Sequence, residues 1–583
     1  MQRALPFPRL ISHPANASRL AGLAQSLAAP AVLALGLLLR ALLLDRPGLH
    51  PDEALYASWA LRIADGSDPA LLGVYVDKPP LLLYLLAGLF RLAGYDGGAP
   101  LDASRLLLAG RLAALLASGA SLALLWLIAR RVHGPRVALA ALALLALSPL
   151  AVRLSPTLFT DPWLVLWLLL GLWAALDRRA WLAGIACGLA FATKQQAVLL
   201  APLVLVVLGG SLLRDASADL SMTEAHDRTM AADAAAGTVK AAWPRAVGRW
   251  LSGFALVAVF VLWWDSLRWQ WMPSYWDRSA QTYGGVALAL DGSLSQRLGQ
   301  WGELLGYGLG WPLWLALAAL ILWALVLQVQ SPGRPAGAVM DENSGNRSAT
   351  GPSSEPSSTQ RRQSMAGQRH WFNVLTLVYV AGYLALHIVT NLAPWDRYLL
   401  PLLPLLALLL ARGAVGVWDM LFAAAQPARR PGWQRQIAIA ALALGAAYAV
   451  YTASLARLPL SDGGAYDGVP ALAAHVRTAE PAGAILYHHW LGWHYNFYLY
   501  DAPVELRWWQ DTADLARKAA ASPGQRQLIA FPAGRDDGSV QAALAAANLH
   551  LRPVLSVGDA QGAPSATLYS IEPVPSGAAR HAP

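Results

Sequence analysis

The sequence predicts a polytopic α-helical membrane protein of about 11 transmembrane helices, followed by a small C-terminal α/β soluble domain. Apolar residues make up 56% of the 583-residue chain and charged residues only 14%, which is not the composition of a soluble protein. Apolar runs long enough to cross a bilayer recur from Leu23 to Leu455. After Leu455 the hydropathy falls, and helical and strand patterns alternate.

The apolar segments predicted to cross the membrane are residues 23–44, 105–128, 136–152, 162–177, 180–193, 197–213, 250–267, 309–328, 371–391, 398–414 and 435–455. Residues 79–94 contain an apolar core of about 16 residues, fewer than the roughly 20 that a perpendicular span needs. We expect this segment to lie on the membrane surface. The basic loop 130–136 then faces the cytoplasm, as the bias of Lys and Arg toward cytoplasmic loops requires.

The distribution of charge orients the chain and divides it. The predicted parts are a cytoplasmic N-terminus 1–22, a transmembrane domain 23–455 with an outer loop 45–104 that holds candidate catalytic residues, two cytoplasmic connections 214–249 and 331–370, and an extracytoplasmic α/β domain 456–583. The connection 214–249 is polar and rich in Ala. The connection 331–370 is rich in Ser, Pro and Gly and poor in apolar residues, so we expect it to be disordered.

Within the C-terminal domain, helices are predicted over 469–480, 512–521 and 540–547, and strands over 484–488, 527–531, 549–557 and 567–571. The group formed by His488, His489, His494 and two neighbouring tryptophans does not have the spacing of a zinc site, so packing or carbohydrate stacking is the favoured interpretation. The single cysteine, Cys187, lies in an apolar helix and excludes a disulfide framework. The net charge of +9 reflects Arg residues in membrane loops and does not indicate nucleic-acid binding.

Asp52, in the stretch His50-Pro51-Asp52-Glu53, is the strongest catalytic candidate. A carboxylate on a partly buried outer loop can act as a general base toward a hydroxyl or an amine. The alternative interpretation is a helix N-cap, a position that favours Asp. Side chains of adjacent helical residues point about 100° apart, so Glu53 cannot share the same task and is assigned a supporting role.

Asp77 and Lys78 precede two prolines that rigidify the chain. Lys78 could neutralise a phosphate, and Asp77 could hold a metal, an acceptor or Lys78 itself. A solvated turn with a lysine that reaches to the interface is the alternative. A divalent metal therefore stays undecided, with Asp52 and Asp77 as its candidate ligands.

Three further charged residues fall on the same predicted face. Asp161 precedes Pro162 and is also a good helix start. Lys194 interrupts two apolar spans with no acid beside it, which suits a phosphate anion, although an interfacial lysine explains it almost as well. Arg397 heads a span, and a guanidinium can grip a phosphate through two oxygens at once.

An ordered set of segments resembles the protein mannosyltransferase and aminoarabinose lipid A transferase family, which are GT-C membrane glycosyltransferases (family 39-like). These segments read HPDEALYA, YVDKPPLLLYLLAGLFRLAG, RLLLAGRLAALLASGASLALLWLIARRVHG, TLFTDPWLVLWLLLGLWAAL, GLAFATKQQAVLLAPLVL and RYLLPLLPLLALLLARG. The resemblance runs from about residue 30 to 415. Two positions depart from the family: Asp77 stands where Glu is common, and Gln195 stands where Gly often follows the lysine.

The resemblance implies an inverting transfer of a monosaccharide from a polyprenyl-phosphate carrier to an extracytoplasmic acceptor, which is a protein, lipid or glycan. It implies Asp52 as the catalytic aspartate of the first outer loop. Asp77 and Lys78 match the family's acid–lysine pair before a double proline. The residues that match polar positions lining the family's outer cavity are Asp161, Lys194 and Arg397. The expected location is the bacterial plasma membrane, with the site and the C-terminal domain on the extracytoplasmic side. A flippase for a lipid-linked sugar and a non-catalytic glycan-binding partner are the alternatives.

Overall fold

The structure is a computed structural model that describes most of the chain. The described residues are 14–46, 48–98, 100–220, 228–289, 293–310, 358–422, 444, 447–448, 450–452, 454, 465–535, 538–559 and 562–574. The predicted spans 309–328 and 435–455 lie largely outside these residues. The same is true of most of the predicted disordered connection, residues 331–357.

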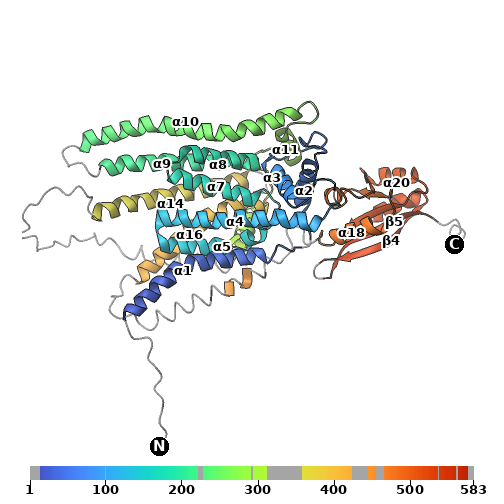
Figure 1. Cartoon of the computed structure of the whole chain (residues 1–583), viewed down its shortest axis with the longest axis horizontal. Coiled ribbons are helices and arrows are strands. Elements are labelled where there is room, and N and C mark those ends of the chain that lie inside the picture. Colours follow the sequence, from blue (N-terminus) through green and yellow to red (C-terminus); the bar gives the residue numbers. More distant parts are fainter. Residues whose placement is uncertain are drawn as a thin grey trace, which may run out of the picture.

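The apolar part of the chain is a bundle of helices whose long members run side by side (Figure 1). The bundle contains α1 (Pro14–Ala41), α4 (Ala103–His133), α5 (Pro135–Ala146), α6 (Pro149–Leu154), α7 (Asp161–Leu176), α8 (Ala180–Thr193), η1 (Gln195–Leu199), α9 (Ala201–Leu220), α10 (Arg228–Arg268), α14 (Ser358–Val389), α15 (Asp396–Leu399), η2 (Leu400–Leu402) and α16 (Leu403–Phe422). Four shorter helices, α2 (Pro51–Ala64), α3 (Leu81–Leu92), α11 (Tyr275–Tyr283) and α12 (Leu294–Leu309), complete the described part of this unit.

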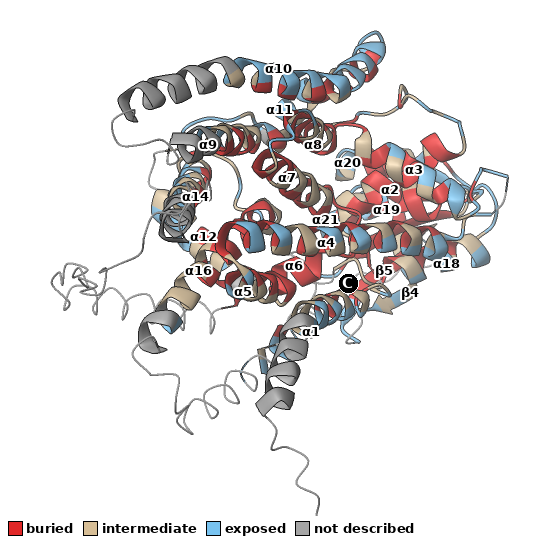
Figure 2. Ribbon diagram, turned by 60° about the vertical axis from the view of Figure 1, so that its left-hand side comes forward, coloured by how far each residue is buried: buried red, intermediate tan, exposed pale blue. Residues whose placement is uncertain are grey.

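Buried residues face the centre of the bundle, whereas the outer faces of α4 and α10 are exposed (Figure 2). Large apolar side chains are exposed on these faces, among them Leu112, Leu116, Val259, Phe260 and Trp263. Exposed apolar bands around a helical bundle are what a bilayer requires. The chain is thus a multi-pass membrane protein with a helical bundle and a small C-terminal sheet.

Of the described helices, five are long and apolar enough to cross a membrane: residues 103–133, 195–213, 242–268, 371–389 and 396–416. Shorter apolar helices cover residues 27–41, 81–92, 135–146, 161–176 and 180–193. The predicted number of about 11 spans is therefore not confirmed.

Two boundaries predicted from the sequence are wrong. The predicted span 136–152 is broken into α5 and α6, because Pro149 cannot continue the α5 hydrogen bonds and the Ser148 hydroxyl accepts from the Ala151 N–H to cap α6. The predicted disordered connection 331–370 ends earlier than expected, since α14 begins at Ser358. Its first turns are rich in Gln and Arg, which favour helix.

Helices α8 and α10 lie in close contact because glycines face each other's backbone. A Cβ atom at Gly184 would lie 2.0 Å from the carbonyl oxygen of Trp250, and one at Gly253 would lie 2.2 Å from that of Trp181. Only glycine allows such an approach of two helix backbones. This contact fixes α8, and with it Lys194 at the C-terminal end of α8.

The C-terminal unit is a five-stranded sheet in the order β2-β1-β3-β5-β4 (Figure 1). Its elements are α18 (Val469–Ala479), β1 (Ile485–His488), α19 (Gly492–Tyr498), β2 (Glu505–Trp508), α20 (Thr512–Ala520), β3 (Gln527–Pro532), α21 (Gly538–Ala546), β4 (Leu549–Gly558) and β5 (Pro564–Pro573). Strand β1 pairs in parallel with β2 and β3, and β5 pairs antiparallel with β3 and β4. The sequence predicted every one of these elements except α19 and β2.

Candidate active site

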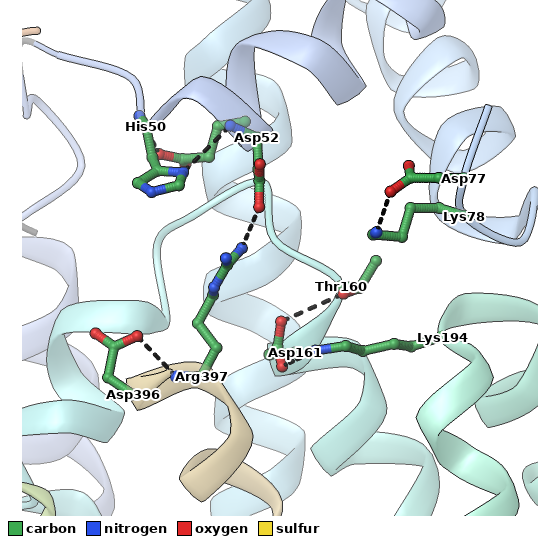
Figure 3. A network of polar contacts seen from close by, with 10 residues as sticks. His50, Asp52, Asp77, Lys78, Thr160, Asp161, Lys194, Asp396 and Arg397 are labelled. Atoms are coloured by element: carbon green, nitrogen blue, oxygen red, sulfur yellow. Dashed lines mark hydrogen bonds and ion pairs between the residues drawn. The ribbon is translucent and has the colours of Figure 1, made fainter. Parts of the chain in front are cut away.

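The candidate residues meet at the end of the bundle that adjoins the C-terminal unit (Figures 1 and 3). Asp52 lies in the first turn of α2, and Asp77 and Lys78 lie in the loop before α3. Asp161 begins α7, Lys194 ends α8, and Arg397 lies in α15. Residues hundreds of positions apart in the sequence therefore lie in one part of the structure.

Asp52 is bound by Arg397, since Nη1 of Arg397 lies 2.5 Å from Oδ2 of Asp52. The guanidinium of Arg397 also stacks on Phe159, with its central carbon 4.6 Å from the ring centre. The Asp52 side chain is 29% exposed and that of Arg397 14%, so solvent still reaches the carboxylate. Figure 3 shows Arg397 reaching from α15 toward Asp52.

The cap of α2 is His50 and not Asp52. The Nδ1 atom of His50 accepts the Asp52 N–H at 3.2 Å, and Glu53 accepts the His50 N–H at 3.0 Å, which together form a capping box. The second oxygen of Glu53 accepts the N–H of Leu158 at 2.9 Å. Both oxygens of Glu53 therefore accept backbone N–H groups, whereas the Asp52 carboxylate does not take part in the cap.

Burial alone would raise the pKa of Asp52, but the neighbouring Arg397 guanidinium, with smaller contributions from His50 and Lys78, holds that pKa below its usual value. Asp52 is therefore an ionised carboxylate at neutral pH. An ionised carboxylate can accept a proton from a bound hydroxyl or amine.

Asp77 and Lys78 bind each other, with Nζ of Lys78 2.6 Å from Oδ2 of Asp77. This is one of the three partners predicted for Asp77. The other oxygen of Asp77 is buried with no hydrogen-bond partner. Gln195, the residue that departs from the family pattern, donates from Nε2 to the Asp77 carbonyl at 3.3 Å and to the Ser279 hydroxyl at 2.7 Å.

Lys194 is paired with an acid after all, although the sequence around it contains none. Its Nζ lies 2.7 Å from Oδ1 of Asp161, and the two side chains are 10% and 1% exposed. The ammonium also lies 4.9 Å from the ring centre of Tyr398. A lysine on one helix end and an acid on another become partners only through the packing of α7 against α8.

The loop that carries Asp52 is held from two sides. Arg111 of α4 donates to the carbonyls of Leu44 and Arg46, at 2.9 and 2.7 Å. On the other side, Nε2 of His494 in α19 lies 3.0 Å from the carbonyl oxygen of Leu49. The C-terminal unit thus contacts the segment immediately before α2.

A second contact ties the C-terminal unit to the other end of α2. The Tyr500 hydroxyl donates to Asp65 at 2.7 Å and lies 3.0 Å from the Ser67 hydroxyl. Asp501 accepts the N–H of Leu101 at 2.7 Å. His494 belongs to the histidine group for which packing or carbohydrate stacking is the favoured interpretation. Its contact with Leu49 joins the C-terminal unit to the helical bundle.

The candidate metal ligands Asp52 and Asp77 do not fit a dedicated metal site. Among the residues that the structure describes, no three His, Cys, Asp or Glu side chains come together as a metal would need. Asp52 is engaged by Arg397 and Asp77 by Lys78.

Sequence reasoning missed several neutral and aromatic neighbours of the charged group. The Phe159 ring lies against the Arg397 guanidinium, and the Tyr398 ring lies against the Lys194 ammonium. The Gln195 side chain donates to the Asp77 carbonyl. Arg153 of α6 is a further buried cation. It is buried on Tyr307, and its Nε and Nη2 atoms have no hydrogen-bond partner. No sequence signal distinguishes these residues from ordinary core residues.

Comparison with known proteins identifies the fold. The chain is similar to the crystal structure of ArnT from Cupriavidus metallidurans bound to undecaprenyl phosphate, with 16% identity and a TM-score of 0.53, over 92% of this chain and 97% of that one. It is also similar to the same protein in the apo state, with 16% identity and a TM-score of 0.50, over the same shares of both chains. No curated protein is similar enough to count as a match.

The model of the dolichyl-phosphate-mannose-protein mannosyltransferase family matches residues 77–220, a segment that contains Asp77, Lys78, Asp161 and Lys194. The matched segment is about a quarter of the chain, and the likeness to the two ArnT structures shows a shared fold. Asp52 and Arg397 lie outside the matched segment, so their assignment to the candidate site rests on their contact with each other.

Proposed function

We propose that the chain is an inverting glycosyltransferase that moves a monosaccharide from a polyprenyl-phosphate carrier to an extracytoplasmic acceptor. The acceptor is a protein, lipid or glycan, and the site lies on the extracytoplasmic face of a bacterial plasma membrane. The observation that carries this proposal is the pair of Asp52 and Arg397. In this pair an ionised carboxylate lies directly beside a guanidinium 345 positions away in the sequence, and a guanidinium is a group that can bind phosphate.

In the proposed reaction, Asp52 removes the proton of the acceptor hydroxyl or amine. The acceptor atom bonds to the anomeric carbon on the face opposite the phosphate. The bond between that carbon and the phosphate oxygen breaks, and its electron pair stays on the carrier phosphate. No general acid is needed, because the phosphate is already a good leaving group.

The departing phosphate gains one negative charge, and the cations Lys78, Lys194 and Arg397 are proposed to stabilise it. Each of these cations is paired with a carboxylate, at 2.5 to 2.7 Å. We propose that Asp161 and Asp77 keep their lysines charged and in position at the entrance to the site. Glu53 is proposed to act by holding the cap of α2.

Arg397 has a further part in the proposal. When a donor phosphate engages its guanidinium, Asp52 loses the cation that lowers its pKa. Burial then raises the pKa of Asp52, which makes it a stronger base at the moment the donor is present. Proton removal is thereby coupled to occupation of the donor site.

The test uses the purified full-length protein in vesicles with polyprenyl-phosphate-linked sugars as donors. Wild type should release polyprenyl phosphate and a glycosylated acceptor, and Lys78→Met should raise the donor KM more than it lowers kcat. Turnover that is unaffected by Lys78→Met would contradict the assigned phosphate contact. Mass analysis of cell-envelope glycans with and without the gene would identify sugar and acceptor.

The side of the membrane from which the candidate site can be reached distinguishes the transferase from the flippase alternative. Every candidate charge of the described residues lies at one end of the bundle, whereas a flippase exposes its site to both faces in turn. In a Cys187→Ser background, an Asp52→Cys variant should react with a membrane-impermeant thiol reagent only from the extracytoplasmic side. Labelling from the cytoplasm would favour the flippase.

A further inference from the structure

A cavity of about 710 Å³ lies between α1, α4 and α5, away from the candidate site. Its walls are apolar and include Leu33 of α1, Leu127 of α4 and Leu139 of α5. The volume falls within the range of roughly 300–1,000 Å³ that is typical of small-molecule sites. A cavity of this kind is large enough to accept an apolar chain.

The mouth of the cavity is basic. Arg130 and Arg136 line it together with Trp126, and both arginines are exposed. The Arg130 guanidinium lies on the Trp126 ring, with its central carbon 4.9 Å from the ring centre. Arg131 points elsewhere, because it pairs with Asp177 and donates to the Leu176 carbonyl. The three arginines of the loop 130–136 are accompanied by no acid in that loop.

The cavity lies at the opposite end of the bundle from Asp52. Arg111 holds the loop before α2, and about 28 Å of α4 separates Arg111 from Arg130. The hydrocarbon core of a bilayer is about 30 Å thick. With α4 crossing the membrane, Arg130 in its last turn and Arg136 in the first turn of α5 lie at the level of the lipid headgroups on the face opposite the candidate site.

We propose that this cavity binds an anionic phospholipid. One acyl chain enters between α1, α4 and α5, and the headgroup phosphate lies between Arg130 and Arg136, which can each offer paired N–H donors. Trp126 holds the Arg130 guanidinium at the interface. An apolar chamber with a cationic mouth matches a lipid with a charged headgroup and matches neither a free anion nor a zwitterionic lipid as well. The site is separate from the proposed transfer reaction.

The test measures lipid binding to the full-length protein after removal of bound lipid in detergent. Phosphatidylglycerol should raise Tm and appear as a bound adduct in native mass spectrometry. Phosphatidylcholine with the same acyl chains, and glycerol 3-phosphate without them, should do neither. The double variant Arg130→Gln/Arg136→Gln should weaken phosphatidylglycerol binding about tenfold or more.

Two further variants separate the site from general surface charge. Arg179→Gln is a matched control, because Arg179 also stacks on a tryptophan, Trp173, at 5.0 Å and lies beside Asp177 at the same end of the bundle. It should leave binding unchanged. Leu139→Trp fills the cavity and should abolish phosphatidylglycerol binding without removing charge. The proposal is overturned by equal binding of phosphatidylcholine, by equal binding of glycerol 3-phosphate, or by an equal loss in Arg179→Gln.

Discussion

Substitution of Arg397 by Gln should move the pH dependence of transfer. Arg397 lies 2.5 Å from Asp52 and is the ion-pair partner of its carboxylate. In the wild type the pKa of Asp52 lies below its usual value, so Asp52 is ionised at neutral pH. Without the guanidinium, the effect of burial, which raises the pKa, is no longer offset.

The size of this shift follows from the geometry. An opposite charge within about 4–6 Å typically changes a carboxylate pKa by roughly 1–3 units. Because the Asp52 side chain is 29% exposed, water screens part of the interaction, and we expect the lower half of that range. The acid limb of kcat/KM should therefore move up by about 1–2 pH units in Arg397→Gln. It should stay in place in Arg397→Lys, which keeps the charge.

The assay is transfer from a polyprenyl-phosphate sugar, with kcat/KM followed between pH 4 and 8. Arg153→Gln serves as a control, because Arg153 is likewise a buried arginine stacked on an aromatic ring but is not paired with Asp52. It should not move the acid limb. If the acid limb of kcat/KM in Arg397→Gln coincides with that of the wild type, Arg397 does not set the pKa of Asp52.

Three further predictions concern the framework of the site. Lys194→Met leaves the buried Asp161 carboxylate without its cation and should lower the free energy of unfolding by roughly 3–5 kcal/mol, measured as a lower Tm. The double variant Lys194→Met/Asp161→Leu should recover most of the lost stability. An equally low Tm in the double variant would contradict the role of this ion pair. His494→Ala leaves the Leu49 carbonyl without its hydrogen-bond donor, which should cost about 1–3 kcal/mol of stability. It should also lower kcat about tenfold while the KM for the sugar donor is unchanged. A change in KM alone would argue that His494 does not position the segment before Asp52. Glu53→Gln should weaken the N-terminal cap of α2 and so lower Tm, while the folded protein keeps its transfer rate. A variant that is inactive but fully stable would instead show that Glu53 takes part in the chemistry.

Local patterns made much of the fold predictable. The helix over residues 180–193 follows from the continuous apolar run there, and the structure has this helix as α8. The same is true of most C-terminal elements. By contrast, α11 and α12 were not predicted, because their segment 268–308 mixes polar and aromatic residues without a clear period.

The pairing of charges could not be predicted, since it depends on tertiary packing. The stretch around Lys194 contains no acid, yet α7 and α8 bring Asp161 to it. The cap of α2 is His50 and not Asp52, because the helix already begins at Pro51. The contact of His494 with Leu49 joins positions 445 apart, and no local pattern reports it.

The central claim is that Asp52 is the base of the transfer reaction. The measurement is a single turnover with a polyprenyl-phosphate sugar and a saturating acceptor, comparing wild type with Asp52→Asn. Asp96→Asn is the matched control, because Asp96 is an exposed acid in the segment between α2 and α4 and its carboxylate accepts the N–H of Gly98. Asp52→Asn should reduce the transfer rate by about 10²–10⁴-fold while donor binding and Tm are kept. A transfer rate in Asp52→Asn equal to that of Asp96→Asn, in protein that is folded and binds donor, would contradict the account.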